Sequence, residues 1–115
     1  MSLDLHCVAS PEAKLLHINQ RWEQLLGYTE AELKGGTFLE FIHPDDIAGT
    51  TTALEELNHG DAVANFSNRY RTKKGAYLVL DWNAIYNADE DLYYATARDI
   101  TEQRRTSINL KKTNQ

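Results

Sequence analysis

The spacing of apolar residues changes twice along the chain, and the first change separates a hairpin from a helical region. Over residues 3–8 the apolar positions alternate with more polar ones, which is the spacing of a β-strand. A turn follows in which Pro11 fixes the backbone φ angle, and residues 14–18 then predict a second strand. The first part of the chain is therefore expected to form an antiparallel hairpin.

The next part of the chain carries the signals of short helices. Asn19 is a favourable N-cap for a first helix, which Gly27 is expected to end. Residues 29–32 and 37–40 each begin with threonine and close with glutamate, the spacing of a capping box. In such a box the two residues exchange side-chain to backbone hydrogen bonds, so the pattern predicts a cluster of short helices.

A longer helix is expected to begin at His43-Pro44-Asp45-Asp46 and to end at Gly60. Proline suits the first helical turn, and the two aspartates favour the positive N-terminus of a helix. A histidine beside two aspartates could also indicate a metal site or an acid–base set. Adjacent residues on one turn cannot all converge on one ion, so capping explains them and no metal site is predicted.

After the longer helix the alternation of a β-sheet returns. Strands are predicted over residues 62–72, 76–87 and 92–98, with a glycine-containing turn at 73–75 between the first two. A charged helix over residues 102–112 is expected to follow the last strand. Strands at both ends of the chain, without βαβ alternation, predict an α+β domain with one antiparallel sheet whose face the helices cover.

Alternation also predicts which strand residues face the helices. Most of them are expected to be core, but the buried amide of Asn68 and the indole N–H of Trp82 need hydrogen-bond partners that a small ligand could supply. Ala95 and Ala97 lack bulk and could leave space for such a ligand. The candidate ligand pocket therefore consists of Asn68, Tyr70, Leu80, Trp82, Ala95 and Ala97.

Composition removes several classes of protein. The 115 residues suit one domain, and 12 basic against 17 acidic residues give a net charge of −5, which disfavours a nucleic-acid partner. The apolar stretches are far shorter than the roughly 20 residues that cross a bilayer, and no signal peptide is recognisable. The single cysteine cannot close an internal disulfide. Together these features predict a cytoplasmic domain without membrane contact.

No catalytic set can be assembled from the sequence. Cys7 follows His6, but neighbours in a strand point to opposite faces, so the imidazole cannot serve as base for the thiol. A buried structural thiol is the expected role of Cys7. No nucleophile, base and orienting group occur together elsewhere, so the chain is not expected to be an enzyme by itself.

Four segments together resemble the PAS domain, the sensory module of bacterial signalling proteins. The resemblance covers residues 3–105 in the right order and is carried by residues 19–28, 41–46, 68–75 and 98–102. It implies a five-stranded antiparallel sheet flanked on one face by short helices. It also implies that residues 1–101 are the sensor domain, that Asp99-Ile100-Thr101 is the signal joint, and that residues 102–115 begin an output helix.

Two cofactors of PAS relatives are not expected here. Light-sensing relatives carry an Asn-Cys-Arg motif, whereas the corresponding residues 35–39 contain no cysteine. The strand positions where those relatives place flavin-binding asparagines correspond to Tyr70 and Leu80. Haem-binding relatives use a histidine on the longer helix, and here only His59 at its exposed end is available. The resemblance therefore predicts neither flavin nor haem.

The resemblance implies a sensory input module that binds a small molecule, or relays the state of a partner, to a C-terminal output domain. A histidine kinase is the expected output, and a diguanylate cyclase is the alternative. Homodimerisation through the terminal helices is expected as well. A ligand-free dimerisation or scaffold module, whose own side chains fill the pocket, remains the rival interpretation.

Overall fold

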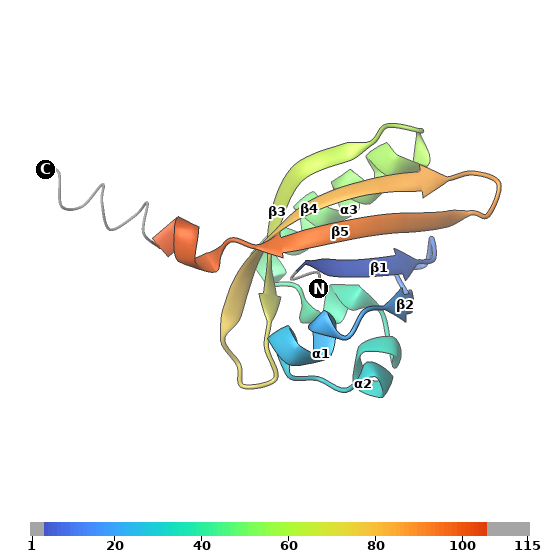
Figure 1. Ribbon diagram of the computed structural model, residues 1–115. Coiled ribbons are helices and arrows are strands. Elements are labelled where there is room, and N and C mark those ends of the chain that lie inside the picture. The colour runs from blue at the N-terminus through green and yellow to red at the C-terminus, as the bar shows by residue number, and fades with distance from the viewer. Residues whose placement is uncertain (1–3, 106–115) are drawn as a thin grey trace, which may run out of the picture.

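The computed structural model describes residues 4–105, which form a five-stranded antiparallel sheet with helices on one face (Figure 1). The strand order is β2-β1-β5-β4-β3, so the first and last strands of the chain lie side by side in the sheet. Strand β1 (Leu5–Ala9) pairs with β2 (Leu15–Ile18) on one side and with β5 (Leu92–Asp99) on the other. The predicted α+β class and antiparallel sheet are confirmed.

The two longest strands form a hairpin at the other edge of the sheet. Strand β3 (Val63–Arg71) pairs with β4 (Tyr77–Asn87), and Gly75 in the turn between them has φ +97°, which suits glycine. Near its start β3 contains a bulge, with Asn65 at φ 57°. After the bulge the alternation resumes with Phe66, so the inward positions of the strand are those that the sequence predicts.

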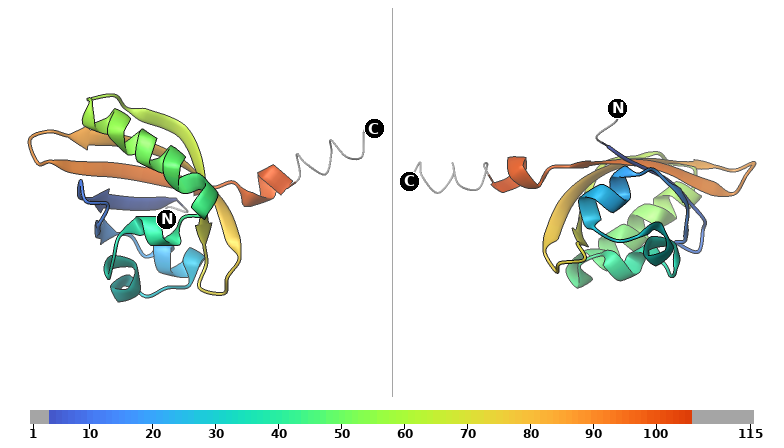
Figure 2. Two further views of the ribbon diagram at one scale, coloured as in Figure 1. Left: turned by 180° about the vertical axis from the view of Figure 1, so that it is seen from behind. Right: turned by 60° about the horizontal axis from the view of Figure 1, so that its bottom comes forward.

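The helices between β2 and β3 in the chain form a layer against one face of the sheet (Figure 2). Two short helices, α1 (Arg21–Leu26) and α2 (Glu30–Lys34), precede the 3-10 helix η1 (Phe38–Phe41). The longer helix α3 (Pro44–Asn58) then runs across the sheet. No helix within residues 4–105 is long and apolar enough to span a membrane.

The capping interactions differ from one predicted helix start to the next. Thr29 and Glu32 form the expected capping box, with the hydroxyl accepting from the Glu32 N–H at 3.1 Å and the carboxylate accepting from the Thr29 N–H at 2.9 Å. The second predicted box is wrong, because Thr37 makes no side-chain cap. Its backbone is held against the hairpin instead, through a bridge to Lys14, and the four residues after it form a 3-10 helix.

Asn19 is not the N-cap of α1, so that expectation is also wrong. Its side-chain amide donates to the Asp4 carbonyl at 2.9 Å, and its side-chain oxygen accepts from the His6 N–H at 3.0 Å. The side chain therefore ties the start of the helical layer to β1, and α1 begins after Gln20 without a side-chain cap.

The start of α3 is fastened to the sheet by a charge pair. As expected, Pro44 begins the helix, and His43 caps it by accepting the Asp45 N–H on Nδ1 at 3.0 Å. Asp46 accepts from the backbone N–H of Arg69 at 2.8 Å and from its guanidinium at 2.9 Å through both Nε and Nη2. The guanidinium hydrogen bonds of Arg69 hold the pKa of Asp46 below its ordinary value.

The chain leaves the sheet at the end of β5. Residues 101–105 are helical and point away from the body of the domain (Figures 1 and 2). The predicted continuation of this helix to residue 112 lies outside the described residues, as does Leu3, where the first strand was expected to begin.

Candidate ligand-binding cavity

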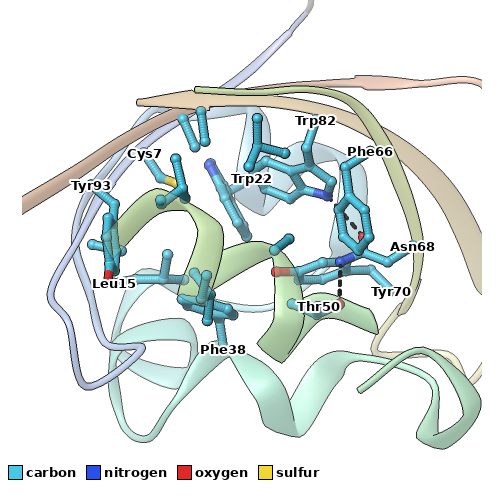
Figure 3. Close-up of a pocket in the computed structure, with 17 residues that line it drawn as sticks. Cys7, Leu15, Trp22, Phe38, Thr50, Phe66, Asn68, Tyr70, Trp82 and Tyr93 are labelled. Atoms are coloured by element: carbon cyan, nitrogen blue, oxygen red, sulfur yellow. Dashed lines mark hydrogen bonds between the residues drawn. The ribbon is translucent and has the colours of Figure 1, made fainter. Parts of the chain in front are cut away.

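A cavity of about 70 Å³ lies between the sheet and the helical layer (Figure 3). Every strand of the sheet contributes to its lining, together with α1, η1 and α3. Among the described residues, most of the lining side chains are apolar and none is charged. They are Cys7, Ala9, Leu15, Trp22, Phe38, Thr50, Ala53, Leu54, Leu57, Val63, Phe66, Asn68, Tyr70, Trp82, Ala84, Tyr93 and Ala95.

The structure brings four of the six predicted pocket residues together at this cavity: Asn68, Tyr70, Trp82 and Ala95. Leu80 and Ala97 are buried, with 0% and 2% of their surface exposed, but neither lines it. Each lies one inward position beyond the cavity. Leu80 lies toward the β3–β4 turn, and Ala97 lies toward the helix that follows β5. Alternation identifies the inward face of a strand but not the point along it where sheet and helices separate.

The helical side of the cavity could not be assigned from strand alternation. Trp22 of α1 is fully buried, and its indole also forms part of the cavity wall (Figure 3). Thr50 and Ala53 face the cavity from α3. A polar residue on the buried side of an otherwise amphipathic helix is the signal that could have identified Thr50.

The polar side chains expected to serve a ligand are bonded to each other. The Trp82 indole N–H donates to Asn68 Oδ1 at 2.8 Å, and Asn68 Nδ2 donates to Thr50 Oγ1 at 3.1 Å. Thr50 in turn donates to the Asp46 carbonyl at 2.8 Å. We call these four residues the polar chain. It links β4, β3 and the first turns of α3 across one end of the cavity, and it leaves none of its side chains without a protein partner.

Tyr70 differs from the other polar residues of the lining. Its ring reaches from β3 across the cavity and its hydroxyl points toward the middle (Figure 3). Within residues 4–105 that hydroxyl is the one nitrogen or oxygen atom of the lining side chains without a hydrogen-bond partner. Burial raises the pKa of Tyr70 well above its ordinary value, so the phenol is neutral.

Cys7 contributes a buried thiol to the cavity wall, as the sequence predicts. Burial raises the pKa of this thiol to about 12, so the reactive thiolate is not formed near neutral pH. His6 is exposed on the opposite face of β1. The geometry therefore offers no base to the thiol.

Other candidate ligands of a metal or of haem lie away from this cavity. His59 follows the last turn of α3, is exposed and does not line the cavity. Among the described residues no group of three or more histidine, cysteine, aspartate or glutamate side chains is placed to hold a metal ion.

The predicted signal joint is held to the sheet by a small set of hydrogen bonds. Thr101 Oγ1 accepts from the Val79 N–H at 2.9 Å and donates to the Asp99 carboxylate. The Thr101 N–H also donates to Asp99 at 2.9 Å, and the Ile100 N–H donates to the Val79 carbonyl at 2.9 Å. These bonds fix the first residues of the exit helix to β4, the strand that carries Trp82.

The family model of the PAS fold matches residues 15–93. Among sequence relatives, protein cycle of Drosophila melanogaster is 31% identical over 81 residues, covering 68% of this chain and 20% of that protein. The probable diguanylate cyclase DgcE of Escherichia coli is 30% identical over 100 residues, covering 83% of this chain and 9% of that protein. The chain thus spans a fifth or less of the length of these relatives.

Solved structures give the same fold. A domain of a sensory box sensor histidine kinase/response regulator from Geobacter sulfurreducens superposes with a TM-score of 0.74 at 19% identity, covering 85% of this chain and 84% of that one. The PAS-B domain of Drosophila melanogaster Cycle with bound ethylene glycol superposes with a TM-score of 0.69 at 26% identity, covering 83% and 96%. With the family model, these matches establish that the chain belongs to the PAS fold family, whose domains serve as non-catalytic signalling input modules.

Proposed function

We propose that this PAS domain senses a small molecule that binds in the cavity, and that it passes the change through Asp99-Ile100-Thr101 to a C-terminal output domain. The observation that carries the proposal is the cavity itself. Protein interiors are packed as densely as organic crystals, so an unfilled apolar space of about 70 Å³ in the centre of a small domain is unusual. The ethylene glycol in the Cycle PAS-B structure supports a ligand in the corresponding domain of a relative.

The position of the joint supports a route for the signal. In the pairing of β4 with β5, Trp82 lies opposite Ala97, and Leu80 lies opposite Asp99. Val79, which holds both Ile100 and Thr101, is three residues from Trp82 along β4. A ligand that moves the Trp82 side chain therefore acts on the strand to which the exit helix is fastened.

Native mass spectrometry of the purified chain tests the proposal. We expect a retained or added small molecule in the wild type, and loss of that molecule in Ala95→Leu, which fills the cavity. A domain that takes up no small molecule from a diverse library, in either form, contradicts the sensor proposal. That result favours the rival scaffold function.

The scaffold function has one observation in its favour, which is the polar chain. Because Asn68, Trp82 and Thr50 are bonded to protein groups, no ligand is needed to satisfy them. Substituting Asn68 is therefore destabilising under either function and does not separate them. Filling the cavity does separate them, since only a sensor loses binding by it.

The output domain and the assembly are proposals about the longer protein. A histidine kinase stays the prediction from the sequence resemblance, and the relative DgcE supports a diguanylate cyclase as the alternative. We propose that the protein acts as a homodimer through its terminal helices, in the cytoplasm, without flavin or haem. Light scattering on this chain and on one extended at the C-terminus tests dimerisation. A protein without flavin or haem should be colourless after purification, which an absorption spectrum tests.

A further inference from the structure

The Tyr70 side chain is held firmly in place although its hydroxyl is unbonded. The residue is 2% exposed, and its ring packs edge-on against Trp22, with centroids 6.1 Å apart, and tilted against Trp82 at 5.7 Å. Two indole rings thus fix the direction of the phenol. The hydroxyl cannot rotate away from the cavity to find water elsewhere, and it points toward the cavity centre (Figure 3).

An unbonded hydroxyl in this position is unfavourable unless something in the cavity bonds to it. A buried polar group without a partner loses its hydration without compensation. Tyr93 shows the usual arrangement, because its ring also lines the cavity while its hydroxyl is hydrogen-bonded to Asn58. Since burial keeps the Tyr70 phenol protonated, it presents an O–H donor to the cavity.

We propose that the cavity ligand is a small, uncharged molecule, apolar except for an acceptor oxygen, and that Tyr70 donates a hydrogen bond to that oxygen. Ketones, ethers and esters have this chemistry. A charged ligand is disfavoured because no charged side chain of residues 4–105 lines the cavity to compensate its desolvation. The inference rests on the proposed function and adds to it the class of ligand and the residue that recognises it.

A matched pair of probes, cyclopentanone and cyclopentane, tests the inference. The two rings have similar size and differ in the acceptor oxygen. The sequence contains two tryptophans, and both Trp22 and Trp82 line the cavity. Their two indole N–H signals in a ¹H–¹⁵N NMR spectrum therefore report binding at this site, and titrations of wild type and variants give the affinities.

Tyr70→Phe removes the hydroxyl and keeps the ring. We expect this substitution to weaken cyclopentanone binding about 3- to 10-fold, which is the net worth of one hydrogen bond, and to leave cyclopentane binding unchanged or slightly tighter. Tyr93→Phe is the matched control. It removes a hydroxyl that is already bonded to Asn58, so it should change the affinities for both probes by the same factor.

Stability without any ligand provides a second readout. Tyr70→Phe should leave the melting temperature unchanged or raise it, since the substitution removes a hydroxyl that borders the cavity and breaks no hydrogen bond to protein. Tyr93→Phe should lower the melting temperature by about 3–8 °C because it breaks a hydrogen bond. If both variants lose stability equally, the Tyr70 hydroxyl has a protein partner and the inference is overturned.

The binding results separate the inference from the function on which it rests. If both probes bind but Tyr70→Phe shows no selective loss for cyclopentanone, the role of Tyr70 is overturned while the cavity remains a binding site. If neither probe binds to the wild type, both the cavity as a binding site and the inference are overturned.

Discussion

Two neighbouring parts of the cavity wall are built in opposite ways. At one end the polar chain runs from Trp82 through Asn68 and Thr50 to Asp46, and each of its side chains bonds to another protein group. Beside it, one inward position further along β4 from Trp82, lies a row of small side chains across three neighbouring strands, which we call the small-residue row. Its members, in register with one another, are Ala84, Ala95 and Cys7.

The contrast shows which part of the cavity wall is held rigidly and which part leaves empty space. The polar chain joins α3 to the sheet through directional bonds in a buried environment, where an unpaired group is costly. The small-residue row leaves volume that no protein atom fills. A substitution should therefore be harmful at the polar chain and tolerated at the small-residue row, and the following measurements test this difference.

Asn68→Leu should have the largest effect. It leaves the buried indole N–H of Trp82 without an acceptor and removes the link to Thr50, so we expect a loss of about 2–3 kcal/mol in the free energy of unfolding. Urea unfolding followed by circular dichroism measures the loss. Glu56→Leu, on the exposed face of α3, is the control and should stay within about 0.5 kcal/mol. Equal small effects of both would show that the polar chain contributes little.

Replacing each of two alanines of β5 by leucine, one at a time, should show where the empty space lies. Ala97 is 2% exposed and does not line the cavity, so Ala97→Leu should overpack the core and cost about 1–3 kcal/mol. Ala95→Leu places the same three carbon atoms into the cavity and should cost less than about 0.5 kcal/mol, or stabilise the domain. The same denaturant melts compare the two variants. A large loss in both would mean that the small-residue row is already closely packed.

Thr50→Val should have an intermediate effect and separates burial from hydrogen bonding. Thr50 and Thr51 both donate to the carbonyl four residues earlier, at 2.8 and 3.0 Å, but Thr50 is 5% exposed whereas Thr51 is exposed. Thr50 alone also accepts from Asn68. We expect Thr50→Val to cost about 1–1.5 kcal/mol and Thr51→Val to be nearly neutral. Thermal unfolding of the pair gives the difference, and equal losses would argue against a role of the polar chain.

The smallest effect should be a pH dependence at the outer end of the polar chain. The pKa of Asp46 lies below its ordinary value of 3.8 because the Arg69 guanidinium bonds to the ionised carboxylate. A lowered folded-state pKa stabilises the fold above the ordinary value, and this contribution disappears as the pH falls through the folded pKa. Asp46→Asn should therefore flatten the loss of stability below about pH 4. Unchanged acid profiles of the melting temperature in wild type and variant would contradict this.

Local sequence patterns account for much of the fold. The alternation of β3, β4 and β5 identified the inward face, and the box at Thr29, the proline start of α3 and the glycine turn at Gly75 were all recognisable. The errors at Asn19 and Thr37 have one cause. A capping residue can bond to its own helix or to a neighbouring segment, and both side chains lie where the hairpin of β1 and β2 competes for the backbone.

The candidate site was predicted only in part, because its side chains also bond to segments far away in the sequence. The sequence showed that Asn68 and Trp82 would be buried polar groups, but not that each would be the partner of the other. Residues 68 and 82 lie opposite Leu80 and Phe66 in the register of β3 and β4, and their side chains meet only because both point into the same face of a twisted sheet. Thr50 joins them from a helix that alternation in the strands does not describe.

By itself the sequence determined the antiparallel sheet, the helical cluster, the family resemblance and the inward position of Tyr70. These follow from periodicity, caps and turns, which depend on residues a few positions apart. Only the tertiary structure decided the place of the cavity, the bonding of the polar chain, the pairing of Asp46 with Arg69 and the unbonded hydroxyl of Tyr70. Each of these depends on how the helical layer, α3 above all, packs against β3 and β4, and that packing brings together segments far apart in the chain.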